Sequence, residues 1–223
     1  MIDWRAIDTV LLDMDGTLLD LHFDSHFWLE HLPRRYVELH QLDEATQEMV
    51  RAKVIGEQGT LDWYSLDYWS RELDVDVVAL KREVQHLIGL RGDALDFLQW
   101  LKLAHPRVVL ATNADRASLE LKLPLTGLAP YLDAIVSSAD LGVPKEEQAF
   151  WSGLQEVEPF VPARTLFIDD NPRVLESARQ FGIQHLLGIK QPDSRQPERE
   201  LEEFTALDTF AAILPGYQEA PNG

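Results

Sequence analysis

The chain has 223 residues, the length of one large domain or of a domain with an insertion. Its 20 Lys and Arg residues against 38 Asp and Glu give a formal net charge of −18, so we expect no nucleic-acid partner. The absence of cysteine excludes disulfides, thiolate nucleophiles and cysteine-based metal centres. No apolar run is long enough for a membrane span and the N-terminus does not resemble a signal peptide, so a cytoplasmic protein without membrane contact is expected.

Short apolar segments rich in Val, Ile and Leu alternate with segments of helical periodicity. Such runs indicate strands buried on both faces, here at residues 9–12, 107–111, 134–136, 165–168 and 185–187. Amphipathic helices are predicted at residues 93–103 and 172–181, the second with Asn171 as N-cap. This alternation predicts an α/β fold with a Rossmann-like, doubly wound parallel sheet.

Residues 20–90 break the alternation. They contain only helical segments, predicted at 25–40 with an interruption near Pro33, at 43–58 from Asp43, at 60–73 from Thr60, and at 75–88. The stretch is too long for a simple crossover. We therefore predict an all-helical cap domain at residues 20–90, inserted into a discontinuous catalytic core of residues 1–19 and 91–223. Near the C-terminus, a last short helix is expected at residues 205–214.

Acidic residues follow the first predicted strand. Asp13 and Asp15 lie two residues apart, so an extended backbone directs both carboxylates to the same side. The carboxyl ends of parallel strands line the crevice in which open α/β sheets bind ligands. Taken alone, Asp15 and Gly16 are equally compatible with a hairpin turn.

Polar residues recur at three later strand ends. Each has an ordinary explanation as a helix cap or a solvated side chain, but together they converge on one crevice: Thr112, Asn113, Lys145, Asp169, Asp170 and Asn171. Crowded carboxylates cannot all stay ionised unless they share a cation. Oxygen ligands without cysteine favour Mg²⁺, and a metal beside an ammonium and a hydroxyl suits a phosphoryl group.

These residues carry a family resemblance. The segment DMDGTLLD at 13–20 resembles the first motif of the haloacid dehalogenase superfamily, Thr112 and Asn113 the second, Lys145 the third, and FIDDN at 167–171 the fourth. A helical insertion directly after the first motif is also similar to that superfamily. One departure is local, because relatives often continue the lysine with proline whereas Glu146 stands here.

The resemblance implies a Mg²⁺-dependent phosphomonoester hydrolase with a defined set of roles. Asp13 would be the nucleophile that forms an aspartyl-phosphate, and Asp15 the general acid and base. Thr112, the Asn113 backbone and Lys145 would bind the phosphate. Mg²⁺ would be held by Asp13, the Asp15 carbonyl and Asp170, with Asp169 as a second ligand or as a group outside the metal shell. The second acid, Asp15, disfavours dehalogenation, since a halide leaves without a proton.

The resemblance also implies that the substrate is a small-molecule phosphomonoester. Aromatic residues of the predicted cap either stack on a nucleobase or form the cap's own core: Phe23, Phe27, Trp28, Trp63, Tyr64, Tyr68 and Trp69. Residues 20–24 and 32–36 resemble bacterial purine 5′-nucleotidases, which implies hydrolysis of GMP and IMP. The alternatives are a sugar-phosphate or phosphoglycolate phosphatase, a phosphomutase, or a non-catalytic ligand-binding relative. The oligomeric state stays open and a monomer is compatible with the sequence.

Overall fold

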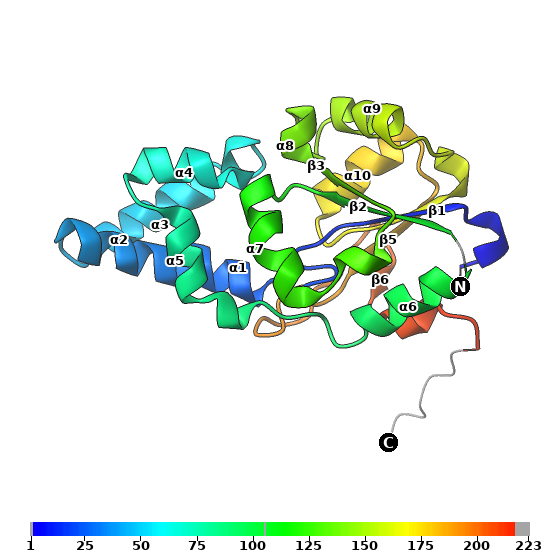
Figure 1. Ribbon diagram of the computed structural model, residues 1–223, viewed down its shortest axis with the longest axis horizontal. Coiled ribbons are helices and arrows are strands. Elements are labelled where there is room, and N and C mark those ends of the chain that lie inside the picture. Colours follow the sequence, from blue (N-terminus) through cyan, green and yellow to red (C-terminus); the bar gives the residue numbers. More distant parts are fainter. Residues whose placement is uncertain (1, 105, 217–223) are drawn as a thin grey trace, which may run out of the picture.

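A parallel six-stranded sheet forms the centre of the larger part of the molecule (Figure 1). The computed structural model describes residues 2–104 and 106–216. The strands run in the order β3-β2-β1-β4-β5-β6. Their bounds are Thr9–Leu12 (β1), Arg107–Thr112 (β2), Ala134–Ser137 (β3), Thr165–Ile168 (β4), His185–Ile189 (β5) and Ala206–Leu207 (β6).

Strand β1 lies in the middle of the sheet, and its register fixes where the strands end. Thr9 pairs with Arg107 of β2 on one side and with Thr165 of β4 on the other. Leu12 correspondingly pairs with Leu110 and Ile168, so the residues that follow these three strands meet at one edge. All five predicted strands are present, but only β1 and β4 are buried along their whole length, because β2 begins exposed and β3 and β5 begin half-buried.

Helices cover both faces of the sheet. On one face, α6 (Ala94–Ala104) packs Phe97, Leu98 and Leu101 against a core that contains Val10 and Leu12 of β1. On the other face, α9 (Gln148–Val157) and α10 (Pro172–Phe181) pack against the intervening Leu11. The predicted doubly wound, Rossmann-like architecture is therefore present. The remaining helices here are α7 (Arg116–Thr126) and α8 (Ser138–Leu141).

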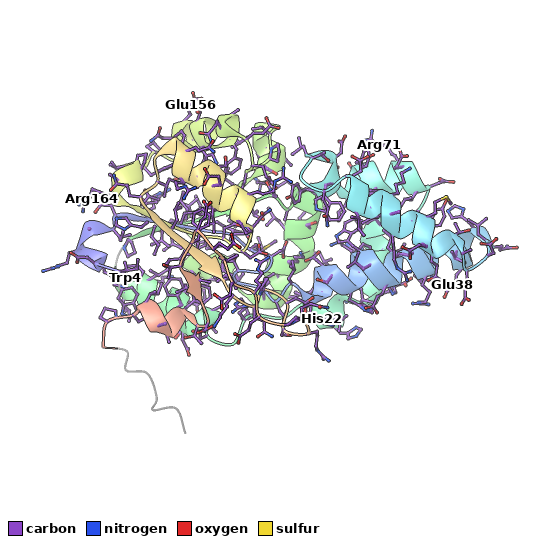
Figure 2. The ribbon with its side chains drawn as sticks, turned by 180° about the vertical axis from the view of Figure 1, so that it is seen from behind. Trp4, His22, Glu38, Arg71, Glu156 and Arg164 are labelled. Carbon is purple, nitrogen blue, oxygen red and sulfur yellow. The ribbon has the colours of Figure 1, made fainter. Side chains whose placement is uncertain are left out.

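The helices between β1 and α6, which we call the insertion, stand at one end of the molecule (Figure 1). The insertion comprises α1 (His22–His26), a π-turn (Phe27–His31), α2 (Leu32–His40), α3 (Thr46–Gly56), α4 (Leu66–Leu73) and α5 (Val77–Glu83). These helices share their own apolar core, which Leu121 of α7 also enters. Seen from behind, Glu38 and Arg71 of the insertion lie at the opposite end of the molecule from Trp4 and Arg164 (Figure 2).

The helices of the insertion differ from the predicted ones at their ends. The predicted interruption near Pro33 is a π-turn, Phe27–His31, and Pro33 lies in the first turn of the helix that follows it. A π-turn is wider than an α-helical turn, so it accommodates the ring of a proline, which also has no N–H to donate. Thr60 caps only a short 3-10 turn at Asp62–Tyr64, and α4 begins later with Ser65 as its N-cap. Asp43 still accepts a hydrogen bond from a backbone N–H at the start of its helix.

Two further predictions concern helix ends in the larger part of the molecule. Asn171 is the N-cap of α10, because its side chain accepts a hydrogen bond from the Arg173 N–H. The predicted helix at 205–214 is wrong in its first half, where residues 206 and 207 extend the sheet as β6 and only Phe210–Ile213 form a 3-10 turn. Among the described residues, no helix is long and apolar enough to cross a membrane.

Candidate active site

The turn after β1 brings the first motif against the fourth. The Asp13 N–H donates to the Ile168 carbonyl, which continues the pairing of β1 with β4 for one more residue. The backbone then turns at Gly16, which has a φ of +85°. A Cβ atom on Gly16 would lie 2.8 Å from Cγ of Asp170. Both the left-handed backbone and this close approach require glycine at position 16.

Lys145 joins two buried carboxylates at the strand ends. Its Nζ donates to Oδ1 of Asp13 at 2.5 Å, to Oδ2 of Asp169 at 2.7 Å and to the Ala111 carbonyl at 3.1 Å. The Lys145 side chain is 2% exposed. Burial alone would lower the pKa of Lys145, but the two carboxylates outweigh it and raise that pKa. The ammonium thus stays charged and fixes one oxygen of Asp13.

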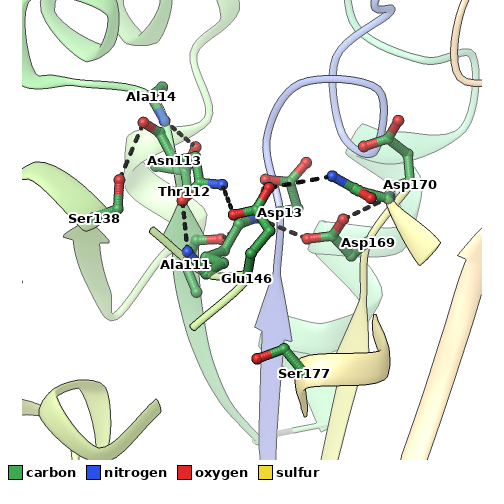
Figure 3. Close-up of polar contacts among 12 residues, drawn as sticks. Asp13, Ala111, Thr112, Asn113, Ala114, Ser138, Glu146, Asp169, Asp170 and Ser177 are labelled. Atoms are coloured by element: carbon green, nitrogen blue, oxygen red, sulfur yellow. Dashed lines mark hydrogen bonds and ion pairs between the residues drawn. The ribbon is translucent and has the colours of Figure 1, made fainter. Parts of the chain in front are cut away.

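The carboxylates of Asp13, Asp169 and Asp170 converge within reach of one cation (Figure 3). One oxygen of each lies within 4.8 Å of the others. Both oxygens of Asp169 already accept hydrogen bonds, from Lys145 and from the Asn171 N–H, whereas Asp13 and Asp170 keep an oxygen for a metal. Burial raises the pKa of Asp170 to about 7, and the neighbouring Asp13 adds to that shift. This all-oxygen donor set fits a hard divalent cation such as Mg²⁺.

Thr112 is the last residue of β2 and Asn113 follows it, and both are almost fully buried. Oγ1 of Thr112 accepts a hydrogen bond from the Ala114 N–H. Both polar atoms of the Asn113 side chain form a hydrogen bond: Oδ1 accepts from the Lys145 N–H at 2.9 Å, and Nδ2 donates to Glu146 at 3.0 Å. The Asn113 carbonyl accepts a hydrogen bond from the Ser138 hydroxyl at 3.2 Å.

Glu146, the residue at the departure from the family pattern, connects three parts of the site. Its carboxylate accepts hydrogen bonds from the hydroxyl of Tyr64 at 2.8 Å, from Nδ2 of Asn113 at 3.0 Å and from Nδ2 of Asn171 at 3.5 Å. Tyr64 belongs to the insertion, Asn113 follows β2 and Asn171 follows β4. The sequence marked this position as unusual but indicated no role for it.

A second buried ionic cluster, which the sequence analysis missed, surrounds Asp15. Lys122 of α7 donates to Oδ1 of Asp15 at 2.7 Å and to Oδ2 of Asp24 at 2.6 Å. Lys81 of α5 donates to Oδ1 of Asp24 at 2.7 Å. Although burial favours a neutral acid, the two ammonium groups lower the pKa of Asp24 to about 2. The available signal was a lysine beside the apolar Leu119 and Leu121, in a segment for which the sequence analysis predicted no helix and which the structure shows as α7.

One cavity of about 450 Å³ joins both ionic clusters. Its walls include the catalytic candidates Asp13, Asp15, Thr112, Asn113, Lys145, Asp169 and Asp170. From the insertion, Trp28, Trp63 and Tyr64 also line it. Phe23, Phe27 and Trp69 instead lie buried in the insertion's own core. Trp28 belongs to that core as well, and Trp63 and Tyr68 pack against it.

Comparison with known proteins shows the family to which this chain belongs. The chain matches the family model of haloacid dehalogenase-like hydrolases over residues 7–182, and it belongs to that family. It is 40% identical, over 215 residues, to the GMP/IMP nucleotidases YrfG of Escherichia coli (strain K12) and of Shigella flexneri, an alignment that covers 96% of this chain and 97% of each relative.

Solved structures share the fold at lower identity. A haloacid dehalogenase-type (HAD) phosphatase from Thermococcus onnurineus superposes with a TM-score of 0.74 at 19% identity, covering 90% of this chain and 93% of the other. The L-2-haloacid dehalogenase from Xanthobacter autotrophicus gives a TM-score of 0.53 at 19% identity, covering 82% and 78%. These similarities show the fold.

Proposed function

We propose that the protein is a Mg²⁺-dependent phosphomonoester hydrolase that removes the 5′-phosphate of purine nucleotides, GMP and IMP above all. The observation that carries the class of reaction is the cavity that holds Asp13, Asp15 and Lys145 together. The substrate class rests on the relatives named GMP/IMP nucleotidase, which match nearly the whole chain. A small-molecule substrate also suits a partly open cavity of this size.

The reaction divides into two steps. In the first, an oxygen of the Asp13 carboxylate attacks phosphorus, the bond from phosphorus to the leaving oxygen breaks, and Asp15 gives that oxygen a proton. In the second, ionised Asp15 takes a proton from water, whose oxygen attacks phosphorus and releases phosphate from Asp13. Lys145 fixes the nucleophile and offsets its charge, while Oγ1 of Thr112 and the Asn113 backbone N–H hold phosphate oxygens.

A divalent cation would be held by the carboxylates of Asp13 and Asp170 and by the Asp15 carbonyl. When bound, Mg²⁺ supplies positive charge that offsets the negative oxygens of the phosphoryl group. Asp169 is assigned the role of holding Lys145 rather than that of a metal ligand, because both of its oxygens already accept hydrogen bonds.

The insertion acts as the cap domain in this proposal, with boundaries at residues 20 and 90 and a core of 1–19 and 91–223. Leu19 and Leu90 form an isolated antiparallel bridge, so the chain leaves and re-enters the core side by side. Residues 217–223 of the proposed core lie outside the described residues. Trp63, on the cavity wall, is assigned the role of stacking on the nucleobase of the substrate.

A substrate panel with and without Mg²⁺ tests the proposal. Phosphate release is measured with GMP, IMP, AMP, a pyrimidine monophosphate, phosphoglycolate and sugar phosphates. We expect GMP and IMP to lead by at least about tenfold in kcat/KM, equivalent to about 1.4 kcal/mol of transition-state stabilisation. A lead by phosphoglycolate or a sugar phosphate would contradict the substrate assignment and keep the reaction. No phosphate release from any substrate would contradict both.

A further inference from the structure

Two lysines lie buried where the insertion meets the core, and the reaction described above assigns no role to either. Lys122 comes from α7 and Lys81 from α5, and each side chain is 2% exposed. Both bond the same carboxylate, Asp24 of α1, one at each oxygen. A buried ammonium is costly unless its charge is offset, so Asp24 explains how both lysines can be inside the protein.

Both lysines line the cavity, but only Lys122 bonds a proposed catalytic residue. Nζ of Lys122 also donates to Oδ1 of Asp15 at 2.7 Å, and among the described residues this is the one hydrogen bond that the Asp15 carboxylate accepts. Oδ2 of Asp15 therefore keeps no partner within that part of the chain. For Lys81, Asp24 is the one acceptor in the same set of residues.

The surroundings of Lys122 hold it in one place. The ring of Phe23 lies 5.3 Å from its Nζ. The neighbouring Leu121 belongs to the apolar core of the insertion, and Ala117 packs against that core. Helix α7 lies between the insertion and the sheet (Figure 1), so its lysine can contact one acid from each.

We propose that Lys122, anchored by Asp24, is a positioning residue for Asp15. It fixes one oxygen of the Asp15 carboxylate and thereby aims the other at the cavity, where the leaving oxygen and later the attacking water must lie. Because Asp24 belongs to the insertion, Asp15 is aligned only while the insertion is docked on the core. This inference rests on the proposed phosphatase function.

The two chemical steps depend on Asp15 to different degrees. A nucleoside alkoxide is a poor leaving group, so breaking its bond to phosphorus in the first step requires the Asp15 proton. Nitrophenolate leaves from p-nitrophenyl phosphate as a stable anion and needs no proton. The second step, in which Asp15 takes the proton of water, is the same for both substrates. A misaligned Asp15 must therefore slow both steps with GMP but only the second with p-nitrophenyl phosphate.

Lys122→Met, assayed with Mg²⁺ present, separates these steps. With GMP, we expect kcat to fall about 100-fold, the usual size of general acid–base assistance, while KM changes by less than about threefold. In rapid mixing with p-nitrophenyl phosphate, we expect a burst of nitrophenolate that approaches one equivalent per enzyme, followed by slow turnover. The burst reports an aspartyl-phosphate that forms normally and hydrolyses slowly.

Lys81→Met is the matched control, since it removes an equally buried lysine from the same carboxylate. We expect a comparable loss of thermal stability, equal proportional changes with the two substrates, and no burst. Asp24→Asn keeps Lys122 but weakens its anchor, and should show the Lys122→Met pattern at smaller size. If Lys122→Met does not fold, Asp24→Asn replaces it in the same experiment.

Equal losses on both substrates without a burst in Lys122→Met would overturn the inference. The same burst in Lys81→Met would also overturn it, because the cluster would then act as a whole. Wild-type enzyme that releases phosphate from neither substrate would contradict the proposed function itself, which keeps the two failures distinct.

Discussion

The hydroxyl of Tyr64 donates a hydrogen bond of 2.8 Å to Oε1 of Glu146, across 82 positions of sequence. Tyr64 belongs to the insertion, whereas Glu146 directly follows Lys145 in the core. The same carboxylate accepts from Nδ2 of Asn113, whose other side-chain atom, Oδ1, accepts from the Lys145 N–H. The position of the insertion is therefore connected by hydrogen bonds to the residues proposed to hold phosphate.

Tyr64→Phe tests this connection with little change in shape. The loss of one hydrogen bond to a carboxylate costs about 1.5–3 kcal/mol, so we expect kcat/KM for GMP to fall by about tenfold or more. Steady-state kinetics on the nucleotide panel measure the effect. Tyr68→Phe, in the same segment but away from the cavity, is the control and should match the wild type. Equal losses of kcat/KM in both variants would show that the Tyr64 hydroxyl has no specific role beyond side-chain packing.

Asp13→Asn should abolish turnover and leave the fold intact. The amide has nearly the shape of the carboxylate and can still accept the Lys145 hydrogen bond, but it cannot attack phosphorus. Phosphate release and thermal unfolding, measured on the same preparation, check both parts of the expectation. Asp8→Asn, which alters an exposed ion pair with Arg164, is the control. Activity near the wild-type level in Asp13→Asn would remove Asp13 as the nucleophile.

Mg²⁺ should stabilise the protein against unfolding. A ligand that binds only the folded state at 100 times its dissociation constant adds about 2.7 kcal/mol to the free energy of unfolding. Urea unfolding with Mg²⁺ and with a chelator measures this difference. In Asp170→Asn one of the converging carboxylates is gone, so most of the Mg²⁺-dependent gain should disappear. An equal gain in wild type and variant would place the cation elsewhere.

Trp63 and Trp69 should respond differently to truncation. Trp63 lines the cavity, so Trp63→Ala should raise KM for GMP more than KM for p-nitrophenyl phosphate. Trp69 is fully buried, so Trp69→Ala should lower the free energy of unfolding by about 3–5 kcal/mol. Kinetics and urea unfolding on both variants separate the two roles. A stability loss of that size in Trp63→Ala would assign it to the insertion's core as well.

The sequence was most informative where a local pattern determines a local structure. Apolar runs predicted the strands, and Asn171 before Pro172 located the start of α10 because capping depends on adjacent residues. Strand β6 was missed because its two residues pair with β5 through tertiary contact and carry no periodicity of their own. The start of α4 was misplaced because Thr60 and Ser65 are both good caps, and packing of the insertion selects between them.

The candidate site divides in the same way. Strand-end residues such as Asp13 and Asp170 could be predicted, since parallel strands bring their ends together and the motifs lie beside them. Asp24, Lys81 and Lys122 could not, because their meeting depends on how the insertion docks on α7. A single sequence does not encode that docking in any short pattern. The roles of the site residues stay predictions until the variants are measured.

Because of the π-turn at Phe27–His31, the orientation of α1 relative to α2 depends on the exact number of residues between them. In an uninterrupted α-helix, two residues eight positions apart point about 80° away from each other. Here Asp24 reaches Lys122 while Leu32, eight positions later, is fully buried in the insertion's core. Deleting one residue from the turn could preserve a continuous helix, yet it would rotate Asp24 by about 100° relative to Leu32. A homologous chain that is one residue shorter at this point would have to supply the partner of Lys122 from another position.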